Sequence, residues 1–166
     1  MKVIVEVEKM SFKVFIQLVL ASILLIFSTG AAWYEGSALI EHSWEWKHTA
    51  IFSGLVNGQV ENASEILPID YFIYAAKFAH VFPLLMLLSV TYLILIMGYV
   101  LLKRNHKMFT YFLASVGILF LMLSGFVSNS PTNGLIIIST SLLVIGILLL
   151  VIPLVRLVNI KVKEIH

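Results

Sequence analysis

Long runs of apolar side chains alternate with short polar segments along this chain. Four runs are about as long as, or longer than, the roughly 20 residues that an α-helix needs to cross a bilayer core of about 30 Å. They cover residues 14–34, 71–102, 108–127 and 135–155. The pattern therefore predicts an all-α membrane protein, in which a bundle of four transmembrane helices forms a single integral membrane domain over residues 1–166.

The longest polar segment, residues 35–69, separates the first run from the second. Its stretch from Ser43 to Lys47 alternates polar with aromatic side chains, which is typical of a strand. Asn57-Gly58 stands between Leu55-Val56 and Gln59-Val60 and is a strong hairpin signal. We therefore expect a small extracellular β element of two or three strands between the first and second helices.

The second run, residues 71–102, is longer than a bilayer requires. We expect one helix here that extends outward past the bilayer, with Asp70 as its N-cap. Pro83 cannot donate a hydrogen bond to the carbonyl of Ala79, so it predicts a kink in this helix.

The composition also indicates a membrane protein. Of the 166 residues, 60% are hydrophobic and only 12% are charged, whereas a soluble domain usually has about 25% charged residues. This excludes an ordinary cytosolic enzyme, a disordered chain and a nucleic-acid-binding protein. The chain contains no cysteine, which excludes disulfides, thiolate catalysis and cysteine-ligated metal centres.

The basic residues are placed asymmetrically. All but two of the 11 lysines and arginines lie near the N-terminus, between the second and third runs, or after the fourth run. They are Lys2, Lys9, Lys13, Lys103, Arg104, Lys107, Arg156, Lys161 and Lys163. Because basic residues remain on the cytoplasmic side during insertion, we predict a multi-pass plasma-membrane protein with cytoplasmic termini and residues 35–69 outside. The first run also resembles a cleavable signal peptide, but its length favours a retained span.

Five residues form a candidate interaction surface. Trp44 and Trp46 lie in the segment expected outside, and Tyr74, Lys77 and His80 are three residues apart, near one face of a helix. Tryptophan is enriched in binding hot spots, and an ionisable group at the membrane often has a function. A structural role is the alternative, in which the tryptophans anchor or pack the small sheet and Lys77 pairs with a glutamate of the segment.

Catalytic and cofactor sites are not indicated. His80 is the one histidine within a predicted span, whereas bis-histidine haem needs two at similar depth. The spacing of His42 and His48 fits no recognised metal-ligand pattern. No aspartate or glutamate lies inside a span, where acid–base catalysis would need one. We therefore expect no enzyme activity, no metal and no cofactor.

These observations favour a non-enzymatic integral membrane protein whose extracellular face binds a partner protein or a lipid headgroup. Its expected partners, besides the lipid bilayer, are a membrane or extracellular protein or a second copy of the chain, and no nucleic acid. One alternative is an oligomeric transporter or channel with a pore lined by Gln17 or by hydroxyls of the fourth run. Another is an accessory subunit of a membrane redox or envelope-synthesis enzyme.

Two resemblances bear on these expectations. The stretches Trp33–Ser37, Trp44–Lys47 and Phe72–Phe78 resemble an uncharacterised family of small four-span membrane proteins from spore-forming Gram-positive bacteria, which implies a bacterial plasma membrane and assigns no activity. The layout of one span, a small external sheet and three more spans also resembles the claudins. Trp44 and Trp46 match their tryptophan-bearing sheet, but the claudin cysteine pair is absent, so no junction-forming role is implied.

Overall fold

A computed structural model describes residues 11–165 of the chain, with side chains described up to residue 155. All regular elements in this range are helical. In chain order they are α2 (Phe12–Gly36), the 3-10 helix η1 (Ser37–Glu41), α3 (Ser43–Thr49), α4 (Ile51–Asn57), the 3-10 helix η2 (Ala63–Glu65), α5 (Pro68–Phe78), α6 (Val81–Leu102), α7 (His106–Val127) and α8 (Asn133–Ile165).

Four helical segments in the described range are long and apolar enough to cross a membrane. They are Phe12–Glu41, Val81–Leu102, His106–Val127 and Asn133–Val155. The chain is therefore a multi-pass membrane protein.

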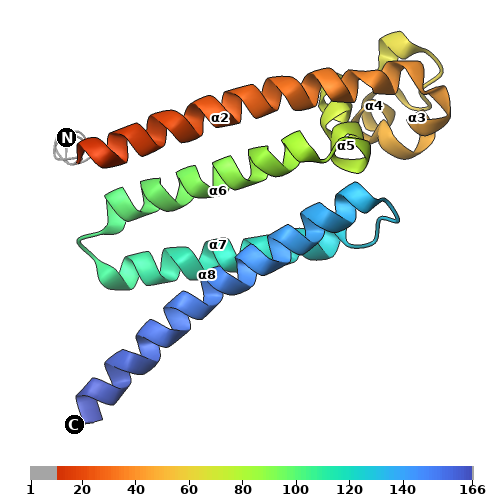
Figure 1. Cartoon of the computed structure of the whole chain (residues 1–166). Coiled ribbons are helices and arrows are strands. Elements are labelled where there is room, and N and C mark those ends of the chain that lie inside the picture. Colours follow the sequence, from red (N-terminus) through yellow and green to blue (C-terminus); the bar gives the residue numbers. More distant parts are fainter. Residues whose placement is uncertain (1–10, 166) are drawn as a thin grey trace.

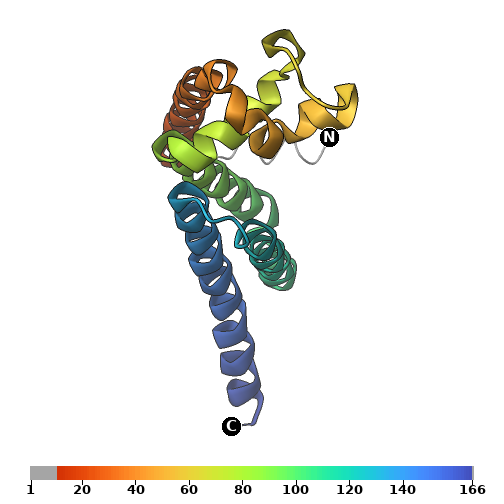
Figure 2. The ribbon, with the colours of Figure 1, turned by 90° about the vertical axis from the view of Figure 1, so that its right-hand side faces the viewer.

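The long helices form an open arrangement, in which α6 lies between α2 and the α7–α8 pair (Figure 1). The main packing partners of α2 are α6 and α5, while α7 and α8 pack chiefly against each other. Figure 2 shows α8 leading away from the other helices toward its C-terminal end. The side chains of α2 are consequently buried less than those of the other membrane helices.

The start of α2, the α6–α7 turn and the C-terminal end of α8 lie at the same end of the molecule (Figure 1). The short helices η1 to α5 lie at the opposite end. Lys13, Lys103 and Lys107 therefore share one end, because they lie near the start of α2, the end of α6 and the start of α7. Lys2 and Lys9 lie outside the described residues, as do the side chains of Arg156, Lys161 and Lys163.

The prediction of a small β element between the first two spans is wrong, because the described residues contain no strand. Ser43–Thr49 is helix α3, in which the Thr49 hydroxyl donates to the Glu45 carboxylate one turn earlier at 2.9 Å. A five-residue alternation is too short to separate a period of 2 from one of about 3.6. Gly58 has a positive φ of 80°, but it ends helix α4 by donating its N–H to the carbonyl of Gly54 at 3.1 Å.

The single kinked helix expected over residues 71–102 is in fact two helices, α5 and α6. Ala79 leaves the helical conformation with φ −126° and ψ 52°. Pro83 is the third residue of α6, a position where an N–H has no partner within the helix in any case. A helix start therefore accommodates Pro83 better than the helix interior that was predicted for it.

Small polar and glycine residues join α7 to α8. The buried hydroxyl of Ser124 donates to the carbonyl of Ser139 at 2.9 Å, and the hydroxyl of Ser139 donates to the carbonyl of Ser124 at 3.1 Å. A Cβ atom on Gly117 would lie 3.0 Å from the carbonyl oxygen of Gly146. Close backbone approach and reciprocal hydrogen bonds are the usual means by which helices associate in lipid.

Two glycines bring α2 and α8 against the backbone of α5. A Cβ atom on Gly36, the last residue of α2, would overlap the carbonyl oxygen of Tyr71. A Cβ atom on Gly134, at the start of α8, would overlap the carbonyl oxygen of Ala76. Only glycine allows these approaches, so α5 is fixed between the ends of two membrane helices.

Gly36→Ala is expected to reduce the free energy of unfolding by about 1–3 kcal/mol, because the methyl group must push α2 away from α5. Gly30→Ala is the matched control on the same helix, since a Cβ atom there has no neighbour within 4 Å. Thermal unfolding in detergent, followed by circular dichroism, compares the two variants. Equal unfolding temperatures for them would contradict the close approach at Gly36.

Candidate functional site

Residues 37–78 form a helical cap on one end of the membrane helices (Figure 1). The cap has a core of its own, made by the buried side chains of Leu39, Ile66 and Tyr71. Trp46 packs against this core, and its indole Nε1 donates a hydrogen bond to the carbonyl of Leu39 at 2.8 Å. Trp46 is therefore a structural residue of the cap.

The carboxylate of Asp70 is fully buried beneath α4. Its oxygens accept hydrogen bonds from the backbone N–H groups of Phe52 at 3.0 Å and Ser53 at 2.8 Å. These are the second and third residues of α4, whose N–H groups have no acceptor inside their own helix. Asp70 thus caps a helix that begins about 20 residues earlier in the chain, where a negative charge is also favoured by the helix dipole.

Ser53 connects this cap to the start of α5. Its hydroxyl donates to the Asp70 carboxylate at 2.5 Å and accepts from the backbone N–H of Leu67 at 2.8 Å. Leu67 is the N-cap residue of α5. The carboxylate therefore has three donors, which is the condition under which a buried charge is tolerated.

The prediction that Asp70 is the N-cap of its own helix is wrong, because Leu67 has that position. Within α5 Asp70 is the third residue, and its side chain turns to α4 instead. One signal was present in the sequence, because Ala50, which precedes α4, has no side-chain acceptor and leaves that helix uncapped locally. Nothing in the local pattern identifies the distant residue that supplies the cap.

Tyr74 and Trp44 meet around His42. The rings of His42 and Tyr74 are stacked with centroids 5.7 Å apart, and Trp44 lies edge-on to His42 at 4.7 Å. Nδ1 of His42 is 2.7 Å from the carbonyl oxygen of Ala38, so it must carry the proton that it donates. The hydroxyl of Tyr74 lies 3.3 Å from the same nitrogen. Burial, with a smaller contribution from Glu45, raises the pKa of Tyr74.

Trp44 itself is 67% exposed, although its neighbours hold it in place. Only one of the two predicted tryptophans is therefore available for an external contact. This difference follows from the helix, because Trp44 and Trp46 are two residues apart and point to different sides of α3, whereas in a strand they would share one face.

Lys77 is committed to contacts within the cap. Its ammonium group donates to the carbonyl of His48 at 2.7 Å and to the hydroxyl of Thr49 at 2.8 Å. The Thr49 hydroxyl in turn donates to the carboxylate of Glu45, so Thr49 lies between Lys77 and a glutamate where a direct pair was predicted. Burial lowers the pKa of Lys77, and the charge of Glu45 opposes that shift.

His80 lies beyond the end of α5, half-buried in the break before α6. It therefore does not continue the face of Tyr74 and Lys77, and the predicted stripe ends at Lys77. Among the described residues, no group of three or more histidine, aspartate or glutamate side chains converges in a way that could hold a metal ion.

Fold and cap together define a multi-pass membrane protein with a structured helical segment between its first two spans. Residues 15–102, which comprise most of α2, the cap and α6, match the model of the family described as "Domain of unknown function (DUF4306)". The match covers more than half of the chain, which belongs to this family. The α7–α8 pair lies outside the matched region.

The chain is also similar to the uncharacterized protein YjdJ of Bacillus subtilis (strain 168), with 35% identity over 81 residues. That alignment covers 48% of this chain and 74% of YjdJ. No solved structure matches the chain. These comparisons support an uncharacterised family found in Bacillus, whereas the likeness to claudins finds no support in them and loses its basis without the sheet.

Asp70→Asn is expected to reduce the free energy of unfolding by about 3 kcal/mol. The asparagine side chain has one accepting oxygen where the carboxylate has two, so one N–H group of α4 is left unpaired. Glu61→Gln removes the same charge from an exposed position of the cap and should have little effect. Thermal or denaturant unfolding in detergent gives the comparison. Similar losses for both variants would show that the buried contacts of Asp70 are unimportant.

Proposed function

We propose that this chain is a non-enzymatic integral membrane protein whose cap binds a partner protein at the extracellular face of the plasma membrane. The observation that carries the proposal is the exposure of Trp44 on a rigid support. Burial of a large aromatic side chain is a principal source of affinity in protein interfaces. An aromatic group that is already ordered also loses little conformational entropy on binding.

The support of Trp44 comes from the cap core. His42, against which Trp44 packs, is hydrogen-bonded to Ala38 and stacked on Tyr74. Tyr74 belongs to α5, which Gly36 and Gly134 hold against the membrane helices. The five predicted residues thus divide by role in this proposal, with Trp44 as the contact residue and Trp46, Tyr74 and Lys77 as its support, whereas His80 lies in the break after α5.

A lipid surface is the second candidate partner, and helix α4 favours it. Leu55 is 77% exposed and its neighbour Val56 is also exposed, which places apolar side chains on the surface of the cap. A short helix with an exposed apolar side is suited to the headgroup region of a bilayer. A lipid contact of this kind would be made by α4 and would not require Trp44, so the two proposals can be tested independently.

Trp44→Ala is expected to reduce recovery of a crosslinked partner at least about tenfold, the effect of losing a hot-spot aromatic. Crosslinking is done in native membranes, followed by affinity purification of the tagged full chain. Tyr111→Ala is the matched control, since Tyr111 is 68% exposed on α7, outside the cap. Unchanged recovery with Trp44→Ala, with the unfolding temperature preserved, would contradict the proposed contact.

The proposed orientation can be tested directly because the chain has no cysteine to interfere with labelling. Ser43→Cys in the cap is expected to react with a membrane-impermeant maleimide added to intact cells. His106→Cys, at the opposite end, should react only after the membrane is opened, since basic residues keep that end inside. The reverse labelling pattern would place the cap in the cytoplasm and remove the basis for an extracellular partner.

A further inference from the structure

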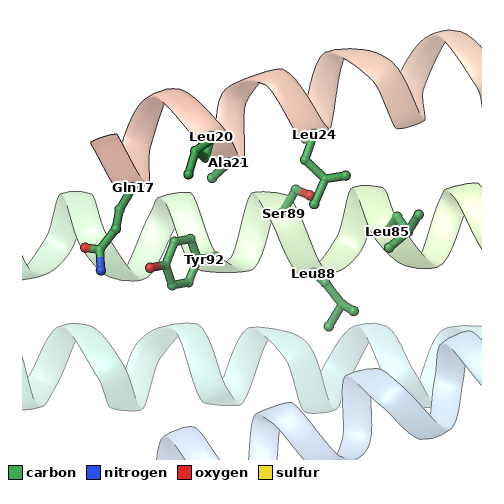
Figure 3. A pocket seen from close by; sticks show the side chains of 8 residues that line it. All are labelled: Gln17, Leu20, Ala21, Leu24, Leu85, Leu88, Ser89 and Tyr92. Atoms are coloured by element: carbon green, nitrogen blue, oxygen red, sulfur yellow. The ribbon is translucent and has the colours of Figure 1, made fainter. Parts of the chain in front are cut away.

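A cavity of about 550 Å³ lies between α2 and α6, away from the cap (Figure 3). Most of its wall is made of leucine and alanine side chains. Leu20 and Tyr92, which both line it, are partly exposed on the surface of the membrane helices. The cavity therefore opens where the bilayer surrounds the protein, and lipid-soluble molecules have direct access to it.

Ser89 is the unusual residue of this cavity. It is only 3% exposed, and its hydroxyl has no hydrogen-bond partner among the described residues. The hydroxyl points toward α2 (Figure 3). A buried hydroxyl without an acceptor is unfavourable, so Ser89 marks the place in the cavity wall where an added acceptor would be stabilising.

Other hydroxyls of the membrane helices behave differently. Two residues further along α6, Thr91 donates to the carbonyl of Leu87 at 2.6 Å. Thr110 donates in the same way to the carbonyl of His106 at 2.8 Å. This bond to the preceding turn is the usual solution for serine and threonine in a membrane helix. Ser89 does not use it, and its buried hydroxyl has no partner among the described residues.

Two further polar groups line the cavity. Gln17 extends from α2 toward α6, and Tyr92 extends from α6 (Figure 3). An amide in hydrocarbon is unfavourable unless it is hydrogen-bonded. Together with Ser89 they give the cavity three uncharged hydrogen-bond donors, and no lining residue is charged.

We propose that this cavity binds a neutral lipid, with a carbonyl oxygen of the lipid accepting hydrogen bonds from Ser89 and the polar groups beside it. The volume is in the usual range of small-molecule sites, about 300–1,000 Å³. A charged phospholipid headgroup is disfavoured because no cationic side chain lines the cavity to compensate it.

A helix of a second copy is the competing occupant, because a helix carbonyl can accept a second hydrogen bond, as that of Ser139 does from Ser124. A lipid carbonyl is favoured here because Gln17 and Tyr92 lie beside Ser89 as further donors in the same cavity. Acylglycerols and quinones with apolar tails share this chemistry, and the experiment separates them.

The test uses the full chain in nanodiscs of dimyristoylphosphatidylcholine, with radiolabelled dioleoylglycerol and decylubiquinone as two separate probes. We expect saturable binding of one probe, with about fivefold to tenfold weaker affinity for Ser89→Ala, the effect of losing one hydrogen bond. Gln17→Leu should also weaken binding of the probe. Gln17 is exposed, so this substitution should not disturb the fold. Thr91→Val is the matched control and should bind like the unchanged protein, because its hydroxyl bonds within α6.

Ser89→Ala should also raise the unfolding temperature without a probe, because it removes an unpartnered buried hydroxyl. If Ser89 is only an unpartnered hydroxyl and binds no lipid, Ser89→Ala will raise the unfolding temperature and leave the probe affinity unchanged. This outcome overturns the proposal. Absence of saturable binding of both probes overturns it too. So does efficient crosslinking between two copies through Leu20→Cys that neither probe reduces, since the cavity would then be a helix contact.

Discussion

The buried carboxylate of Asp70 is the interaction on which the cap depends. It satisfies the open N-terminus of α4 and, through Ser53, the first turn of α5. The two ends that it joins are well separated in the chain, and without it the start of α4 would be uncapped. Since α5 also contacts α2 and α8 at glycines, the carboxylate orients the cap relative to the membrane helices.

From this constraint the exposed surface follows by packing. A fixed α5 places Tyr74 beside His42, and His42 supports Trp44 at the surface. Lys77, from the same helix, holds the end of α3 through the carbonyl of His48 and the hydroxyl of Thr49. The family match spans this arrangement, from most of α2 through the cap to α6.

Features that depend on local composition could be predicted from the sequence, and features that depend on distant contacts could not. Apolar length alone indicates the membrane helices, because the bilayer sets a minimum for each span. The segment Ser43–Lys47 was ambiguous, since five residues do not distinguish strand from helix, and an Asn-Gly pair ends helices as well as forming hairpins. Pro83 correctly indicated an irregularity in the helix, but it did not indicate that one helix ends before it and another begins. The roles of Trp44 and Trp46 differ because the core at Leu39 is built by tertiary contacts that no local pattern encodes.

Amide hydrogen exchange of the protein in nanodiscs tests the central claim most directly. The amides of Phe52 and Ser53 occupy the first turn of a helix, where exchange is normally fast because they have no acceptor within the helix. If the Asp70 carboxylate binds them, both will exchange slowly in the unchanged chain, and at least one of them will exchange rapidly in Asp70→Asn. Rapid exchange of both amides in the unchanged chain would contradict the account.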